Sequence, residues 1–429
     1  MIGMMGLCAA LAVFVMLSFK RCNLALSAIA AGLVLMISNG MDILSGLTDT
    51  FSSGFGSFAS GWWLMFALGA VFGAVMKESG LSRDIAEILS AKLHGNAVFI
   101  ILLISLIMSY GGIGTFIIAF TIYPIAVEMF RRERIRETLL PAVMLFCPTT
   151  LGMTMLPGTP SVQNMIPAKY LGTDIYAAPG LGIAASAITF ALGSVYLANR
   201  VKKNKISGET EDRSIRESQY TASRWLSILP CVILWAVTFV LIRAGLDSQI
   251  AVEISMCIAI VVCIIVGKKD YNVMDVVNQG FANGLETVAM TSCVMGFGAL
   301  VKASPSFSNL ADSIMGGAGN TIAADIIVIN LIAAITGSST SGLQLFFETF
   351  FERLSQTYLS NQQYHRIIAI ASGGLDSMPY ATGVVVANKL AKTDLKQTYV
   401  HIFITCAVIP LISLALILAG EYLLGIVMG

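Results

Sequence analysis

The chain is divided by long runs of apolar residues that carry almost no charge, and this pattern constrains its fold more than any other feature. In hydrocarbon a segment satisfies its backbone polar groups only as a helix or a closed barrel, and about 20 apolar residues in a helix cross the layer. We therefore predict an all-α polytopic membrane protein, whose continuous apolar runs are Met1–Phe19, Leu24–Ser38, Trp62–Met76, Leu181–Ala198, Leu226–Ile242, Ile250–Val266, Leu285–Val301 and Tyr399–Ala419.

Composition excludes the main alternative, a large soluble protein. Hydrophobic residues make up 56% of the chain and charged residues 12%, whereas about a quarter of an average soluble domain is charged. The charged residues lie in short clusters between the apolar runs. Lys20 and Arg21 follow the first run, so we expect a retained helix there and not a signal peptide.

Other partners and cofactors find little support in the sequence. The net charge of +1 gives no argument for nucleic-acid binding. The eight cysteines form no C-x-x-C pair and the three histidines are far apart, so we predict no metal and no cofactor beyond a coupling ion.

The second half of the chain repeats the first at an offset of about 225 residues, far longer than a solenoid repeat, which signals duplication of a whole transmembrane unit. We predict a first half at 1–199, a linker at 200–224 and a second half at 225–429. The matches include Gly54-Phe55 with Gly280-Phe281, Gly95-Asn96 with Gly319-Asn320, Tyr110–Thr115 with Thr336–Ser341, and Met155-Leu156-Pro157 with Ser377-Met378-Pro379.

Basic residues predict the orientation of the two halves. We expect about 10 transmembrane helices in total, five in each half, plus one re-entrant hairpin per half. With the N-terminus outside and the linker in the cytoplasm, most of the 26 Lys and Arg residues face the cytoplasm, as the positive-inside rule requires. Five crossings is an odd number, so the second half is inverted relative to the first. The basic residues left outside are Lys169, Arg243, Lys302, Arg353 and Arg366.

Four further apolar stretches are interrupted near their middles by Gly, Pro, Ser and Thr. Polar backbone inside a membrane is tolerated where it lines a cavity, and the ends of a broken helix attract ions: the N-terminus attracts anions, and the C-terminal carbonyls attract cations. The four stretches are Ala97–Phe130 and Ile322–Phe351, the expected hairpins, and Leu139–Ala168 and Arg366–Asn388, the expected broken helices.

We predict that these interruptions meet at the membrane midplane and bind a small anion and a coupling cation. The candidate binding residues are Gly112, Gly114, Thr115, Thr149, Thr150, Thr154, Gly158, Thr159, Ser161, Gln163, Asn164, Ser338, Ser339, Thr340, Ser341, Gly373, Gly374, Asp376, Ser377 and Tyr380.

Asp376 is the most informative single residue among them. Carboxylates within membrane segments are rare and usually functional. Asp376 lies in the motif Gly-Gly-Leu-Asp-Ser-Met-Pro, and its counterpart in the first half is near the uncharged Thr154. We expect Asp376 to carry a coupling proton or to help bind a cation. The alternative is that it caps the second half-helix and contacts no ligand.

The interrupted stretches resemble those of the gluconate permease family, part of an ion-transporter superfamily with inverted repeats. The resemblance covers most of the chain and is closest to the branch of hydroxybutyrate-type permeases. That branch commonly has Pro-His where this chain has Pro379-Tyr380. The segments that carry the resemblance are Tyr110–Gly112, Tyr123–Ala126, Leu156–Asn164, Ile166-Pro167 and Ala371–Pro379.

This resemblance implies symport of a small hydroxy-carboxylate, such as gluconate, glycerate or 3-hydroxybutyrate, with H⁺ or, in some relatives of the superfamily, Na⁺. It also implies a homodimer in the cell membrane, with a scaffold of uninterrupted helices and a mobile domain of broken ones, which is elevator-type alternating access.

Two other function classes were weighed against symport. A cation or substrate antiporter of the same superfamily stays an alternative. An intramembrane enzyme is not expected, because neither a serine-protease motif nor a pair of intramembrane aspartates is present. No basic residue is expected in the site, so backbone amides, hydroxyls, Gln163 and Asn164 would hold the anion, which favours a monocarboxylate.

Overall fold

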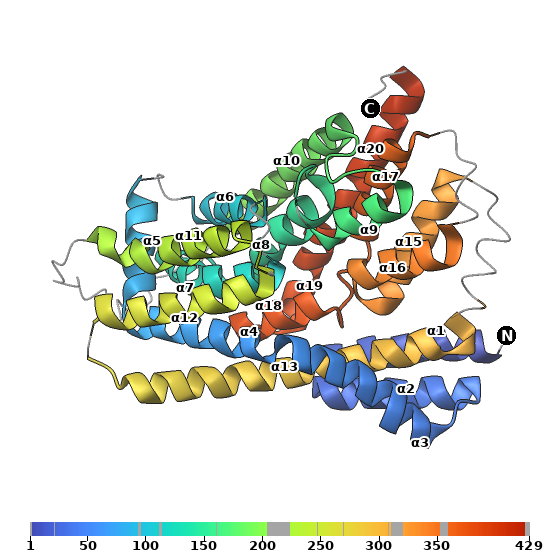
Figure 1. The fold of residues 1–429 in the computed structure, drawn as a ribbon, viewed down its shortest axis with the longest axis horizontal. Coiled ribbons are helices and arrows are strands. Elements are labelled where there is room, and N and C mark those ends of the chain that lie inside the picture. The colour runs from blue at the N-terminus through green and yellow to red at the C-terminus, as the bar shows by residue number, and fades with distance from the viewer. Residues whose placement is uncertain are drawn as a thin grey trace.

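The computed structural model describes residues 2–20, 22–92, 96–110, 114–159, 161–203, 224–246, 248–268, 270–307, 309, 321–351 and 359–424. Within these residues every regular element is a helix, which confirms the predicted all-α class (Figure 1). Most of the predicted linker, residues 204–223, lies outside the described part.

The first 203 residues contain α1 (Ile2–Phe19), α2 (Leu24–Asn39), α3 (Ile43–Ser45), η1 (Gly46–Phe51), α4 (Ser52–Glu78), α5 (Leu81–Lys92), α6 (Ala97–Tyr110), α7 (Thr115–Arg132), η2 (Glu137–Leu139), α8 (Leu140–Phe146), η3 (Cys147–Met155), α9 (Val162–Leu171) and α10 (Pro179–Lys203). The remainder contains η4 (Arg224–Ile228), α11 (Leu229–Arg243), α12 (Ser248–Val266), α13 (Val273–Ala303), α15 (Ile322–Thr336), α16 (Ser339–Phe350), α17 (Asn361–Ser372), α18 (Thr382–Ala391), α19 (Leu395–Phe403), η6 (Ile404–Val408) and α20 (Ile409–Leu424).

Length and hydropathy identify membrane spans among these helices. Within the described residues, 6 helical segments are long and apolar enough to cross a membrane: Ile43–Glu78, Glu137–Met155, Pro179–Lys203, Gln249–Val266, Val273–Ala303 and Leu395–Gly420. Shorter apolar helices accompany them, among them α1, α2, α6 and α15. The chain is therefore an integral membrane protein, while the predicted number of about ten crossings stays a prediction.

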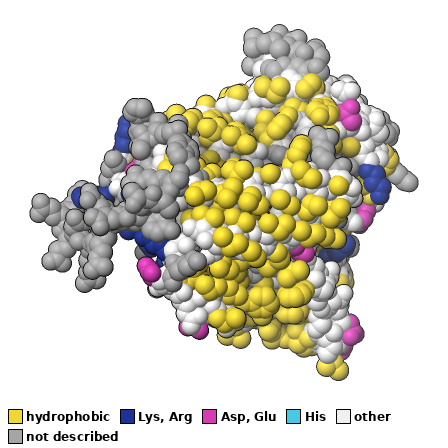
Figure 2. All heavy atoms as spheres, turned by 60° about the vertical axis from the view of Figure 1, so that its left-hand side comes forward, with side chains coloured by type: hydrophobic (Ala, Val, Ile, Leu, Met, Phe, Trp, Pro, Cys, Tyr) yellow, Lys and Arg dark blue, Asp and Glu magenta, His cyan; other side chains and the backbone are white. Residues whose placement is uncertain are grey.

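The outer surface of the molecule is apolar over a broad face. Figure 2 shows hydrophobic side chains across the middle of this face, with most charged side chains at its margins. Several large apolar side chains are more than half exposed, including Ile37, Leu44, Phe239 and Ile265. Contiguous apolar patches of this size are rare on soluble monomers, so this face is suited to contact lipid.

The helices α4 and α13 form a long antiparallel pair along one side of the molecule (Figure 1). With 31 residues, α13 is about 46 Å long, more than the roughly 30 Å hydrocarbon layer. Glycines allow the two backbones to touch: a Cβ on Gly280 would lie 2.8 Å from Val71 Cα, and one on Gly284 would lie 2.6 Å from Ala67 Cα. Close contact of small residues is a main source of helix association in membranes.

Contacts around this pair come in matching sets that join the two halves of the sequence. Helix α2 packs on α13, and α12 packs on α4. The Ser306 N–H, after α13, donates to Asn39 Oδ1 at 3.2 Å, and the Lys268 N–H, after α12, donates to Ser79 O at 3.1 Å. In the same way α9 contacts α17 and α18 contacts α8. The inverted repeat stays a prediction, but such matched contacts are what it would produce.

Two large hydrophobic cores fill the molecule, and each draws on both halves of the sequence. The first gathers side chains mainly from α4 to α8, α11, α12, α18 and α19. The second gathers side chains mainly from α1, α2, α10, α15 to α17 and α20. The boundary near residue 200 therefore divides the sequence, while the packing is shared.

Three of the four predicted interruptions coincide with gaps between helices. Helix α15 ends at Thr336 and α16 begins at Ser339, with Gly337 between them in the left-handed region at φ 61°. Helix α17 ends at Ser372 and α18 begins at Thr382. The third is the break between η3, which ends at Met155, and α9, which begins at Val162. The remaining expected interruption, Tyr110–Thr115, includes residues 111–113, which lie outside the described part.

In the stretch Leu139–Ala168 the expected break covers Cys147–Thr154 and the following Pro157–Asn164. The second part is confirmed, because η3 ends at Met155 and α9 begins at Val162, and the first part, Cys147–Thr154, is wrong. This segment continues α8 as the π-helix η3, and the chain leaves the helix at Leu156. Pro148 removes one backbone donor, and a wider turn accommodates it. Threonine hydroxyls add hydrogen bonds within the segment: Thr149 donates to Leu145 O at 2.8 Å and Thr154 to Thr150 O at 2.8 Å.

Because glycines of α13 contact α4 closely, we predict that a Gly→Ala substitution there lowers stability, whereas in most helices it raises stability. Gly→Ala inside a helix ordinarily stabilises by about 1 kcal/mol. Because a Cβ at residue 284 meets backbone atoms of α4, we expect Gly284→Ala to destabilise by about 1–3 kcal/mol, seen as a lower thermal unfolding midpoint in detergent. Gly56→Ala is the control, since a Cβ there has no described atom within 4 Å. Equal or higher stability of Gly284→Ala would contradict the tight contact.

Candidate binding site at two helix N-termini

The first turns of α9 and α16, from opposite halves of the chain, meet inside the molecule. Ser161 caps α9 by accepting from the Asn164 N–H, and Ser338 caps α16 by accepting from the Ser341 N–H. Gln163, in the first turn of α9, is 1% exposed and donates through Nε2 to Ser339 Oγ at 3.0 Å and to Thr340 Oγ1 at 2.9 Å. Two helix ends with partial positive charge are therefore held side by side.

Asp376 reaches the same place from the gap between α17 and α18. Its carboxyl accepts from Ser377 Oγ at 3.0 Å and lies near Ser339, the first residue of α16. Gln163, Ser339 and Asp376 thus form a cluster to which three separate broken elements contribute. The side chain of Asp376 is partly exposed, so the network is not sealed.

The alternative that Asp376 caps its own half-helix is wrong. Helix α18 begins after Ala381, which has no polar side chain to act as a cap. Asp376 lies instead near the first residue of α16, the helix that Ser338 caps.

The threonines of η3 bond within their own helix. The hydroxyls of Thr149, Thr150 and Thr154 donate to carbonyls of the preceding turn. Thr154 also packs on the end of α17, because a Cβ on Gly373 would lie 2.9 Å from Thr154 Cγ2. These hydroxyls therefore stabilise the π-helix and fit it against the second half of the chain.

The first hairpin contributes Gly114 and Thr115 to this region. Gly114 precedes α7 as its N-cap, and Thr115 Oγ1 donates to Met153 Sδ at 3.0 Å. The start of α7 is thereby attached to η3. Gly112 lies outside the described residues.

Asn164 and the loop before α9 form a closed local network. The Asn164 amide donates to Thr159 O at 3.0 Å and to Thr159 Oγ1 at 2.7 Å. Ser161 Oγ donates to Met153 O at 2.7 Å, and Gly158, at φ 84°, donates its N–H to Ile175 O at 2.9 Å. In this arrangement these residues shape the entry to α9, while Gln163 points at α16.

Arg366 is a residue of this region that sequence reasoning missed. Its side chain is 0% exposed, and its Nη1 donates to Asn164 Oδ1 at 2.7 Å. The expectation that no basic residue lies in the site therefore needs correction. The signal in the sequence is an arginine directly before the apolar segment Ile367–Ala371, which the positive-inside count places simply on the outer side.

Tyr380 lies apart from the Asp376 network. Its hydroxyl donates to Ala334 O at 2.6 Å, and its ring stacks on Phe14 of α1 with the ring centres 5.1 Å apart. The side chain is 2% exposed. Tyr380 therefore joins the end of α15 to α1 in this conformation.

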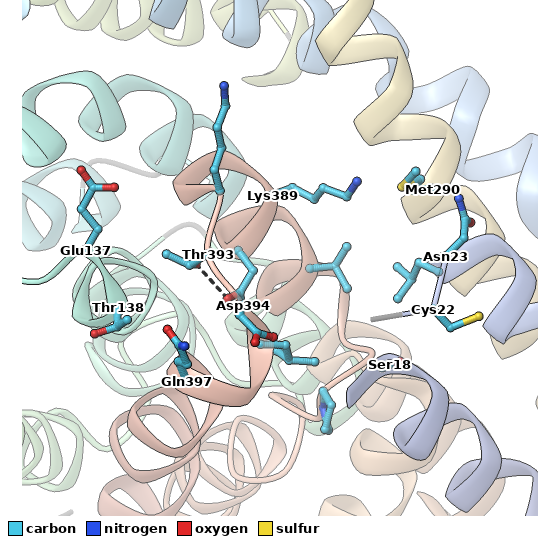
Figure 3. A pocket seen from close by; sticks show the side chains of 16 residues that line it. Ser18, Cys22, Asn23, Glu137, Thr138, Met290, Lys389, Thr393, Asp394 and Gln397 are labelled. Atoms are coloured by element: carbon cyan, nitrogen blue, oxygen red, sulfur yellow. Dashed lines mark hydrogen bonds between the residues drawn. The ribbon is translucent and has the colours of Figure 1, made fainter. Parts of the chain in front are cut away.

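A large cavity opens between the C-terminal end of α1, the middle of α13, and the adjoining α18 and α19 (Figure 3). Its volume is about 940 Å³. Pro379 lines it three residues beyond Asp376, and Lys389 at its edge forms an ion pair with Glu286 of α13 at 3.3 Å. Other lining residues include Ser18, Asn23, Thr138, Asn388, Thr393 and Gln397. Polar and charged side chains therefore line most of this cavity.

The tight fit at the α17–α18 gap generates a second prediction. A Cβ on Gly374 would lie 2.2 Å from Asn330 Oδ1 and 2.7 Å from Leu411 Cδ2. We expect Gly374→Ala to destabilise by about 1–3 kcal/mol through overpacking. Adding Asn330→Ala should restore part of the loss, which a thermal double-mutant cycle measures. Strictly additive effects of the two substitutions would argue against this contact.

Comparison with known proteins identifies the family. The model of the GntP family permeases matches residues 2–342. Over 422 aligned residues the chain is 27% identical to the "Uncharacterized transporter YxjC" of Bacillus subtilis (strain 168), with 87% of this chain and 89% of that protein covered. These findings confirm the resemblance drawn from the interrupted segments. The chain belongs to the GntP permease family, and it is a membrane transporter.

Proposed function

We propose that this protein is a secondary active transporter that carries a small hydroxy-monocarboxylate together with a coupling cation, H⁺ or Na⁺. The observation that supports this most is the network of Gln163, Ser339 and Asp376, which brings two helix N-termini and one carboxyl group to one point. Gluconate, glycerate and 3-hydroxybutyrate are the substrates of suitable chemistry that we expect.

The two helix N-termini favour an anion as the transported molecule. Unpaired N–H groups in the first turns of α9 and α16 carry partial positive charge and can donate to carboxylate oxygens. Hydroxyl groups at Thr340 and Ser341 lie in the same turn of α16 and can recognise the hydroxyl of a substrate. Among the described residues that meet here, the one buried guanidinium already donates to protein groups, which suits one carboxylate more than two or three.

Asp376 is the group through which we expect coupling to act. An ionised carboxylate beside two helix N-termini competes with a substrate anion for the same donors. Binding a proton or Na⁺ at Asp376 cancels that negative charge, so the cation and the substrate favour each other's binding. Reciprocal effects of this kind are required whenever two ligands are coupled.

The fold supports alternating access by movement of the broken elements relative to the α4–α13 pair. The broken elements are joined by side chains of Gln163 and Arg366, so they can move as one body. The cavity of about 940 Å³ would be the approach from one side of the membrane. We expect that side to be the cytoplasm, with the N-terminus outside, and the scaffold to pair in a homodimer in the cell membrane.

A ligand screen on purified protein tests the substrate class. Thermal unfolding is measured with gluconate, glycerate, 3-hydroxybutyrate, lactate and citrate, each with and without Na⁺. We expect one or more monocarboxylates to raise the unfolding midpoint, because ligands that bind the folded state stabilise it. If citrate alone stabilised the protein, the proposal that the substrate is a monocarboxylate would be rejected.

Asp376→Asn tests the coupling in proteoliposomes. We expect uptake driven by a proton or sodium gradient to fall at least about tenfold, while exchange of labelled for unlabelled substrate without a gradient is retained more fully. Ser377→Ala is the matched control, since it removes one hydrogen bond to Asp376 and leaves the carboxyl in place. Full gradient-driven uptake in Asp376→Asn would remove this residue from the coupling step. Uptake that requires a substrate on the opposite side would favour the alternative, an antiporter.

Thiol labelling tests which side the cavity faces. Gln397 lines the cavity and is exposed, while Lys169 lies on the predicted outer side and is also exposed. In a cysteine-free background, we expect Gln397→Cys to react with a membrane-impermeant reagent in inside-out vesicles and Lys169→Cys to react in right-side-out vesicles. The reverse pattern would invert the proposed orientation, and equal labelling of Gln397→Cys from both sides would argue against a cavity open to one side.

A further inference from the structure

Arg366 lies between the two loops that flank α9. Its Nη1 donates to Asn164 Oδ1 at 2.7 Å, and Asn164 in turn holds the loop before α9 through Thr159. On the other side, Nε donates to Ala177 O at 3.0 Å and Nη2 donates to Ile175 O at 3.1 Å, in the loop after α9. One planar guanidinium therefore fixes both ends of a ten-residue helix.

The surroundings of Arg366 are built to admit this side chain. Gly182, near the start of α10, leaves room beside it, because a Cβ there would lie 3.2 Å from Arg366 Nε and 2.6 Å from Met155 O. Within the described part of the chain, Arg366 forms no ion pair, and the exposed Asp174 in the loop after α9 acts on it at longer range. A buried guanidinium without a carboxylate in contact is costly, and intramembrane charges of this kind usually serve function.

We propose that Arg366 is a positioning residue for the transported anion, an inference that rests on the proposed function. Its donors serve Asn164, Ile175 and Ala177, so the guanidinium acts through α9 without touching the substrate. By fixing both ends of α9, it sets the distance between Gln163 and the first turn of α16. Its positive charge also favours an anion at that place over a neutral molecule of the same shape.

The neighbouring side chains of α17 supply a matched control. Tyr364 OH donates to Asp325 Oδ2 at 2.9 Å and so joins α17 to α15, away from α9. The side chain of Tyr364 is 2% exposed, close to the value for Arg366. Tyr364→Phe therefore removes a buried hydrogen bond from the same helix while leaving both loops around α9 in place.

The experiment compares Arg366→Gln, Arg366→Lys and Tyr364→Phe in full-length protein reconstituted in proteoliposomes. The readouts are KM and maximal rate for the best monocarboxylate of the screen, and deuterium exchange at residues 162–171. For Arg366→Gln we expect a KM raised at least about tenfold, which is about 1.4 kcal/mol of binding, with a smaller change in maximal rate. Arg366→Lys keeps the charge and one donor, so its KM should lie between those of Arg366→Gln and the unmodified protein.

Deuterium exchange and the Tyr364→Phe control should distinguish a positioning role from a general loss of stability. Amides at residues 162–171 should exchange faster in both Arg366 variants, while Tyr364→Phe should lower thermal stability and leave both KM and this exchange unchanged. If Arg366→Gln fails to fold, Arg366→Lys alone decides through the same two readouts.

The outcomes separate the two proposals. If the Arg366 variants lose stability as Tyr364→Phe does but keep the original KM, Arg366 is merely structural and the inference is overturned. If the unmodified protein neither binds nor transports any carboxylate of the screen, the proposed function fails instead. In that case faster exchange of α9 in the Arg366 variants would still establish that Arg366 fixes both ends of α9, without a role in anion binding.

Discussion

Hydrocarbon offers no hydrogen bonds, and most of this structure follows from that absence. Every backbone group at membrane depth has to find its partner within the protein, which is why the described residues form helices throughout. Where a helix ends inside the molecule, protein side chains form hydrogen bonds with several of its unpaired backbone groups. Threonine hydroxyls donate to carbonyls along η3, and serines cap α9 and α16. The interruptions are therefore closed internally, and what they leave unpaired is available to a ligand.

The closing groups also connect the interrupted elements to one another. Gln163 joins α9 to α16, and Arg366 joins α17 to both ends of α9. Tyr364 joins α17 to α15. Side chains thus hold the polar interior together, whereas the α4–α13 pair is held by direct backbone contact at glycines. The first kind of contact depends on donors and acceptors that a ligand can also engage, and the second does not.

Much of the fold could be predicted from sequence, because solvent and composition act along the whole chain. Apolar runs identified the helices, and clusters of Gly, Pro and Ser identified the gaps at Gly337 and at Gly373–Ala381. At Cys147–Thr154 the same signal misled, since this segment continues α8 as a π-helix that contains Pro148, and the chain leaves the helix only at Leu156. Contacts between distant segments were beyond reach: neither the Asn164 partner of Arg366 nor the Ala334 partner of Tyr380 is visible without coordinates.

The crossed contacts around α4 and α13 have a consequence for the synthesis of this protein. Helix α2 packs against α13, which begins more than about 230 residues later along the chain, and contacts between segments so distant in sequence form slowly. During translation α1 and α2 are therefore in the membrane long before their partner exists. The polar and glycine-rich faces of α4 are exposed to lipid until α13 has been synthesised. Assembly of this transporter is completed late, and a nascent chain stalled before α13 would leave its first helices open to other proteins in the bilayer.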